Sequence, residues 1–135
     1  MKYPLESDNT GKLVLRLTLG ILILLHGIAK LQNPEASMAG IGKMLQANGL
    51  PAFVAYGSYI GEVLAPLLLI FGVFTRIGAL LIVANMLFAI WLAHASQIFT
   101  LGKQGGWTLE LQGFYLFCAV AVYFLGSGRY AVKPD

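Results

Sequence analysis

Titratable side chains stand inside apolar stretches of this sequence, where residues that do chemistry are easiest to recognise. They are His26, Lys30, Glu62, His94 and Glu110. A charged side chain at the centre of a bilayer costs roughly 3 kcal/mol, so such residues pair with one another, face protein or serve a function. Histidine and glutamate can exchange protons with a bound ligand, and a lysine ammonium attracts anions. We predict that these five residues form a polar cluster.

Helices that cross a membrane must position this cluster, because the composition rules out a water-soluble domain. The chain has 135 residues, of which 58% are hydrophobic and 11% charged, and its mean hydropathy is +0.76. Soluble domains carry roughly 25% charged residues, and short chains bury only a modest share of their surface. The remaining apolar surface must face lipid, which predicts one all-α integral membrane domain over residues 1–135.

Four apolar stretches have about the length that a helix needs to cross the hydrocarbon core, roughly 20 residues. They cover residues 13–31, 53–74, 77–98 and 109–125. Only Thr75 and Arg76 separate the second stretch from the third, which makes these two antiparallel neighbours. Pro66 is expected to kink the second stretch or to free one of its carbonyl groups. The prediction is a four-helix bundle.

A short amphipathic helix is expected between the first two stretches. Within residues 35–48, apolar side chains recur at helical spacing at Met38, Ile41, Met44 and Leu45. Such a helix lies at the membrane interface, with its apolar face toward the lipid.

The distribution of basic residues predicts the orientation in the membrane. Six lie on the side that carries both termini: Lys2, Lys12, Arg16, Arg76, Arg129 and Lys133. Three lie on the opposite side: Lys30, Lys43 and Lys103. The positive-inside rule then places both termini in the cytoplasm, and the polar cluster falls in the outer half of the bundle.

Helical spacing indicates which polar residues share a face. His26 and Lys30 are four residues apart, so their side chains are neighbours on one face. Arg16 returns to nearly the same face, and Gly20 and Gly27 line that stripe, which allows a second helix to approach closely. Glu62 is the natural partner of Lys30 or His26.

Each polar residue also has a structural interpretation. Lys30 could extend to the headgroups, Glu110 could stabilise the start of a helix through its dipole, and His94 could lie at the interface. Asn85 is expected to join helices by hydrogen bonding. The residues expected to pack or anchor helices are Arg16, Gly20, Gly27, Asn85, Arg76 and Arg129.

Several function classes do not fit this sequence. The single cysteine, Cys118, forms no intrachain disulfide and no Cys-x-x-Cys pair, which argues against thiol-oxidising membrane enzymes. The net charge of +3 is too small to suggest nucleic acid. The sequence contains no haem-attachment motif, iron–sulfur cysteine set or glycine-rich nucleotide loop, and it predicts no metal site.

The order and spacing of these motifs resemble the DoxX family of small bacterial inner-membrane proteins. The first stretch reads L-R-L-T-L-G-x6-G-x-x-K-L, and the second runs into the third as G-E-V-L-A-P-L-L-L-I-F-G-V-F-T-R-I-G. The tail reads G-S-G-R-Y, with Ser127 where the family often has proline. The matching residues are Arg16, Gly20, His26, Gly27, Lys30, Gly61, Glu62, Thr75, Arg76, Gly126, Gly128, Arg129 and Tyr130.

The resemblance implies a four-helix fold in the bacterial inner membrane and a link to respiratory redox chemistry, since some relatives are subunits of thiosulfate:quinone oxidoreductase. We therefore predict a redox-associated subunit that handles a quinone or a small sulfur anion alongside redox partner proteins, rather than an enzyme on its own. The alternatives are a small transporter, which would need a homo-oligomer, a lipid-binding protein, or an assembly subunit.

Overall fold

The computed structural model describes residues 7–135, where every regular element is helical apart from an isolated β-bridge between Leu101 and Trp107. The α-helices are α1 (Asp8–Gln32), α2 (Pro34–Ala47), α3 (Ala65–Phe71), α4 (Thr75–His94) and α5 (Glu110–Leu125). Two short 3₁₀-helices, η1 (Ala52–Gly57) and η3 (Ala95–Gln97), and one π-helix, η2 (Ile60–Leu64), complete the set. The predicted all-helical class is confirmed.

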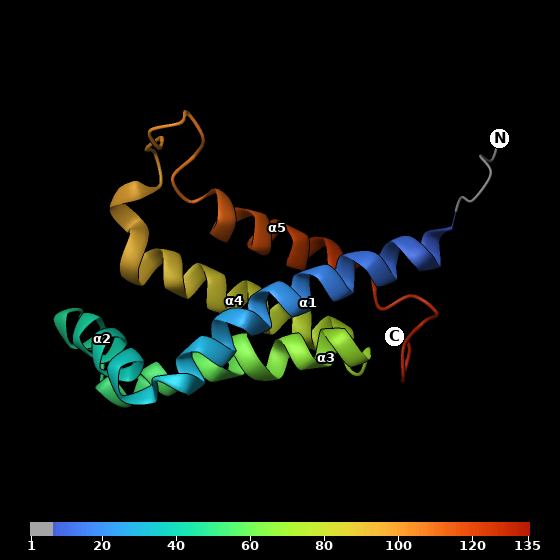
Figure 1. The fold of residues 1–135 in the computed structure, drawn as a ribbon, viewed down its shortest axis with the longest axis horizontal. Coiled ribbons are helices and arrows are strands. Elements are labelled where there is room, and N and C mark those ends of the chain that lie inside the picture. Colours follow the sequence, from blue (N-terminus) through green and yellow to red (C-terminus); the bar gives the residue numbers. More distant parts are fainter. Residues whose placement is uncertain (1–6) are drawn as a thin grey trace.

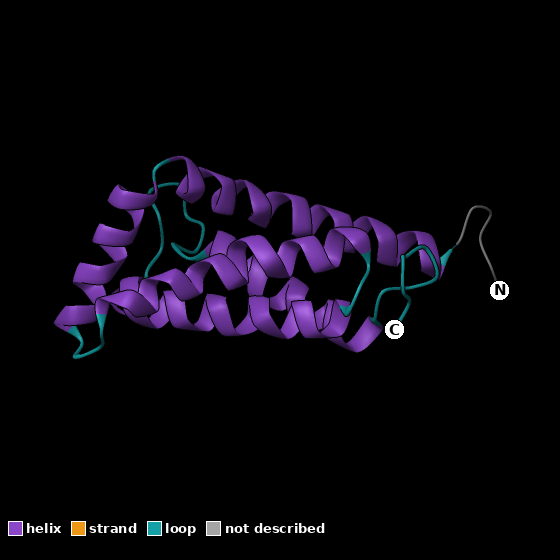
Figure 2. Cartoon of the chain, turned by 90° about the horizontal axis from the view of Figure 1, so that it is seen from below, coloured by secondary structure: helices purple, strands orange, loops and turns teal. Residues whose placement is uncertain are grey.

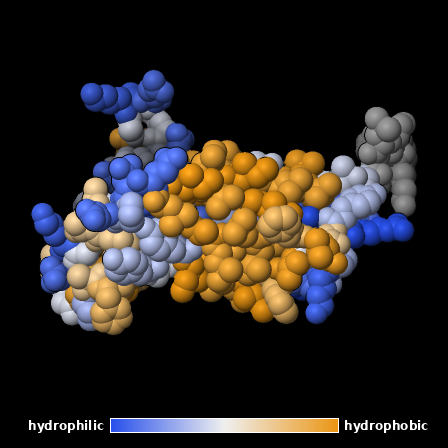
Figure 3. All heavy atoms as spheres, turned by 60° about the horizontal axis from the view of Figure 1, so that its bottom comes forward, coloured by the Kyte–Doolittle hydropathy of each residue, from blue (hydrophilic) through white to orange (hydrophobic). Residues whose placement is uncertain are grey.

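Three helical stretches are long and apolar enough to cross a membrane: Asp8–Gln32, Ala52–Phe71 and Thr75–Gln97. The last helix, α5, is also apolar but has only 16 residues. Hydrophobic atoms form a broad band across the middle of the molecule, and hydrophilic atoms gather at its two ends (Figure 3). This distribution is that of a membrane protein.

The long helices lie side by side and enclose one core (Figures 1 and 2). Helix α1 packs against α3 and α5, and α4 packs against the same two helices. Buried side chains from all four helices meet between them, including Leu19, Leu69, Ile82 and Val122. Helix α2 lies at one end of the molecule and packs on η1 through Leu45 and its neighbours.

Two helix boundaries differ from the predicted stretches. Helix α1 begins at Asp8, because the Ser7 side chain accepts a hydrogen bond from the Thr10 N–H at 3.2 Å and Asp8 favours the helix start. Helix α4 begins at Thr75 and changes to a 3₁₀ turn at Ala95. Hydropathy locates the apolar part of a helix, whereas caps decide where the helix begins.

The second apolar stretch is three successive helical pieces instead of one regular helix. Pro66 has no N–H, so it cannot donate to the carbonyl of Glu62 as the α-helical pattern requires. The Ala65 N–H bonds instead to Ile60, five residues back, which widens the helix into the π-turn η2. The expected effect of Pro66 therefore takes the form of a π-turn, and this turn carries Glu62.

The Glu62 backbone carbonyl lies directly against Gly27 of α1. A Cβ atom built on Gly27 would collide with that carbonyl group and with Val63. The same stripe of α1 also approaches α3, since a Cβ on Gly20 would lie 2.9 Å from Ile70 Cγ1. The predicted close packing along this stripe is thus present, and it fixes α1 against the π-turn.

We expect Gly27→Ala to lower the free energy of unfolding by about 1–3 kcal/mol, because the π-turn must shift to admit the methyl group. Gly11→Ala in the same helix is the matched control, since a Cβ there meets nothing within 4 Å. The control is expected to stabilise slightly, because alanine is the better helix former. Unfolding by denaturing detergent in mixed micelles measures both, and equal effects would contradict the close approach.

Candidate functional site

Polar residues from α1, η2, α4 and α5 meet in one cavity of about 150 Å³. The cavity is lined by Ile23, His26, Lys30, Glu62, Asn85, Met86, Ala89, His94, Leu111, Gln112 and Tyr115. Four of the five residues in the predicted polar cluster lie there, and Glu110 does not. Residues far apart in the sequence are thus brought to one place between apolar helices.

An ion pair joins two helical elements at this cavity. The Lys30 ammonium of α1 donates a hydrogen bond to the Glu62 carboxylate on the π-turn. The Glu62 side chain is 9% exposed and that of Lys30 is 25% exposed, so the pair is largely removed from solvent. Nearby, the Tyr59 hydroxyl donates to the Lys30 backbone carbonyl at 3.4 Å. The pair places a cation and a carboxylate beside the same small space.

The two histidines line the cavity in different settings. The His26 ring meets the Tyr115 ring edge to face, with centroids 6.0 Å apart. In His94, Nδ1 lies 2.8 Å from the amide oxygen of Gln97, which holds the imidazole in place. Imidazole can give or take a proton near neutral pH. The cavity therefore holds two proton-exchanging groups on separate helices.

Tyr115 and Gln112 were not among the five predicted residues, and Glu110 was. Glu110 is exposed in the first turn of α5, with its carboxylate beside Gly106 of the preceding loop. Its position fits the interpretation that it stabilises a helix start. Gln112 and Tyr115 are three residues apart on α5, so one helix face carries both. That spacing is the sequence signal by which they could have been found.

Comparison with known proteins identifies the family of this chain. The DoxX family model matches residues 11–95, which is more than half of the chain and includes His26, Lys30, Glu62 and His94. The chain belongs to the DoxX family. It is also 34% identical over 129 residues to the putative oxidoreductase CatD of Bacillus subtilis (strain 168), which covers 96% of this chain and 89% of that relative. No solved structure matches it.

In this DoxX protein, Arg16 is the anchor of the end that carries the termini. Its side chain is 2% exposed and donates to two backbone carbonyls, Ser127 at 2.6 Å and Tyr130 at 2.7 Å. Both acceptors lie in the tail that follows α5. The tail also bonds to the end of α3, through the Val132 N–H to Phe71 at 3.0 Å. One buried guanidinium thus connects α1 to the tail.

Arg76 and Arg129, also predicted to anchor helices, have exposed side chains. Their backbone N–H groups take part in the structure instead. The Arg76 N–H donates to the Asp135 carboxylate at 3.1 Å, and the Arg129 N–H donates to the Asn9 side chain at 2.9 Å. These bonds tie the tail to α4 and α1.

Asn85 joins helices by close packing instead of the hydrogen bond expected of it. A Cβ built on Gly61 would collide with the Asn85 side chain, so α4 and η2 approach closely here. Within residues 7–135 the Asn85 amide forms no side-chain hydrogen bond. Its polar atoms are therefore available at the edge of the polar cavity.

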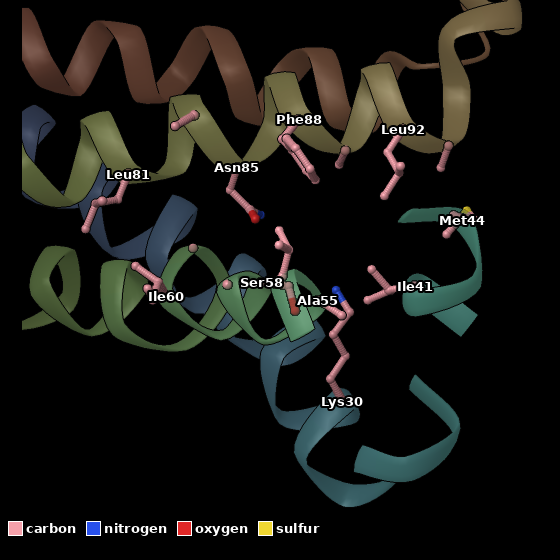
Figure 4. A pocket seen from close by; sticks show the side chains of 16 residues that line it. Lys30, Ile41, Met44, Ala55, Ser58, Ile60, Leu81, Asn85, Phe88 and Leu92 are labelled. Carbon is pink, nitrogen blue, oxygen red and sulfur yellow. The ribbon is translucent and has the colours of Figure 1, made fainter. Parts of the chain in front are cut away.

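A second, larger cavity opens beside the first between α2, η1, η2 and α4. This lateral groove has a volume of about 450 Å³, and its walls are mostly apolar (Figure 4). Lys30 and Asn85 reach toward it from α1 and α4 (Figure 4). Lys30, Asn85 and Ala89 line both the groove and the polar cavity. The two spaces therefore adjoin at these residues.

We next consider the side chains that could bind a metal ion. Within residues 7–135, no group of three histidine, cysteine, aspartate or glutamate side chains is placed to hold a metal ion. Cys118 is a free, partly buried cysteine on α5. What the polar cavity offers is proton exchange and charge, held within an apolar surround.

Proposed function

We propose that this protein is a quinone-binding subunit of a membrane oxidoreductase. The observation that carries the proposal is the polar cavity, where the Lys30–Glu62 ion pair and two histidines meet between apolar helices. Its similarity to a relative named a putative oxidoreductase supports a redox association. The membrane setting fits a substrate dissolved in lipid.

The residues in the cavity fit the chemistry of a quinone head group. Reduction of a quinone to a quinol takes up two electrons and two protons, and oxidation releases them. Hydrogen bonds to the quinone oxygens can come from Lys30, Gln112 or an imidazole. His26, His94 and Glu62 can hold the protons that are exchanged. The electrons come from a redox partner protein, because this sequence has no motif for an electron carrier of its own.

We further propose a topology that places this cavity in the outer half of the bacterial inner membrane. The four apolar helical stretches each cross once, α2 lies at the interface, and both termini are cytoplasmic. Support comes from the excess of lysine and arginine at the end that carries the termini. Protons exchanged at the cavity would then pass to or from the outer surface.

Quinone binding tests the proposal directly. Glu62→Gln and His26→Ala are each expected to weaken binding of a quinone about 10-fold to 100-fold, because each removes a polar group that lines the cavity. Equilibrium titration of the protein in lipid nanodiscs measures the dissociation constants.

Glu110→Gln is the matched control, since it makes the same chemical change outside the cavity. It is expected to bind quinone as the wild type does. A wild type that binds no quinone, or three variants that all bind equally well, would contradict the proposed site.

The lateral groove also favours a second candidate, a lipid-binding protein without a redox role, because its apolar walls suit an acyl chain. The two candidates differ in a measurable way. A lipid-binding protein would retain phospholipid through purification and would bind quinone no better in the wild type than in Glu62→Gln.

A further inference from the structure

The lateral groove leads from the surrounding lipid to the polar cavity, and its inner end is polar. We propose that this groove binds the isoprenoid tail of the quinone, which makes a polyprenyl quinone, and not a water-soluble one, the substrate. This inference rests on the proposed function and adds the class of substrate and the route by which it reaches the cavity.

The groove exists because small residues face it from both sides. On α4, Ala84 and Ala93 line it at positions where neighbouring residues of that helix carry large side chains. On the opposite wall, Gly57 leaves the backbone of η1 uncovered, since a Cβ atom built there would meet nothing within 4 Å. Its volume of about 450 Å³ lies in the range of small-molecule sites, roughly 300–1,000 Å³. The space therefore suits an extended chain lying along α4.

Polar groups at the inner end lack partners of their own. Within residues 7–135 the Ser58 hydroxyl is buried and has no hydrogen-bond partner, and the Asn85 amide forms no side-chain hydrogen bond either. An unpaired polar group in a membrane interior is costly, because no water is there to satisfy it. A ligand that fits must be polar at this end and apolar along the rest.

Because the groove adjoins the polar cavity, the polar head group of the ligand would lie in the cavity and its apolar tail in the groove. Lys30 and Asn85 line both spaces, so a head group in the polar cavity would continue into the groove past these two residues. From there the chain would run between Phe88 of α4 and Met44 of α2. A quinone head with an isoprenoid tail has this distribution of polar and apolar parts.

A larger side chain in the groove distinguishes binding of the quinone tail from binding of its head group. We expect Ala84→Phe to weaken binding of a naphthoquinone with a long polyprenyl chain about tenfold, because the ring would occupy the space for the tail. Binding of the same head group with only a methyl substituent is expected to stay unchanged, which also shows that the variant is folded. Leu87→Phe is the matched control on α4, since Leu87 is exposed outside the groove.

Photocrosslinking of the wild type gives a second readout that needs no variant. A polyprenyl naphthoquinone with a diazirine on its tail is expected to label residues that line the groove, such as Met44 and Phe88, and unlabelled quinone should compete. Labelling instead between α1 and α5, where Val14, Leu22 and Cys118 line another apolar cavity, would overturn the inference.

The outcomes separate this inference from the proposed function. If both quinones bind the wild type and Ala84→Phe affects neither, the groove does not hold the tail but the head-group site stands. If Ala84→Phe weakens both quinones equally, tail binding is likewise refuted. If the wild type binds neither quinone, both proposals fall together.

Discussion

Replacing Arg16 with leucine is expected to lower the free energy of unfolding by about 3 kcal/mol. The loss follows from two hydrogen bonds of the buried guanidinium to the carbonyls of Ser127 and Tyr130, each worth about 1.5 kcal/mol or more because the donor is charged. Those carbonyls would be left without their donor. Unfolding by denaturing detergent in mixed micelles measures the change, and faster proteolysis of residues 126–135 should accompany it.

Two further variants test whether the guanidinium is responsible. Arg129→Leu removes an arginine whose side chain is exposed and whose contact is made by the backbone, so its effect should stay within about 0.5 kcal/mol. Arg16→Lys keeps the charge but loses the planar fork that reaches two carbonyls at once, so it should fall between the two. If Arg16→Leu were as stable as Arg129→Leu, the tail would not be held by Arg16.

Breaking the Lys30–Glu62 pair is expected to have a large effect that depends on which partner is replaced. Lys30→Met should cost about 2 kcal/mol, because it leaves the Glu62 carboxylate, 9% exposed, without its partner on a rigid turn. Glu62→Gln should cost about 1 kcal/mol, because the flexible Lys30 side chain is already 25% exposed and can extend toward the headgroups. Detergent-induced unfolding of each variant gives the two values.

The double variant completes a double-mutant cycle, which measures how strongly the two side chains interact. Lys30→Met with Glu62→Gln should be more stable than Lys30→Met alone, since no unpaired charge remains. Additive losses would show that the two side chains do not interact in the membrane. The pair would then not hold α1 against the π-turn.

Residue types and their spacing along the chain predicted the elements well. The apolar stretches and the scarcity of charge specified an all-helical membrane protein, since these properties reflect the solvent around a helix and depend little on its neighbours. The spacing of His26 and Lys30 placed both on one helix face, and the glycines at positions 20 and 27 marked the side of α1 that another helix approaches closely. These are local properties of a helix.

Only the tertiary structure decided which polar residues share a cavity. Helix rotation depends on contacts between distant segments, such as Gly27 against the Glu62 carbonyl, and periodicity within one helix does not specify them. The predicted Glu110 therefore lies outside the cavity, whereas Tyr115 from the same helix lies inside it. The sequence also did not predict the path of the tail past Arg16. This irregular backbone is held by hydrogen bonds between residues more than 110 positions apart, and no repeating pattern in the sequence marks such contacts.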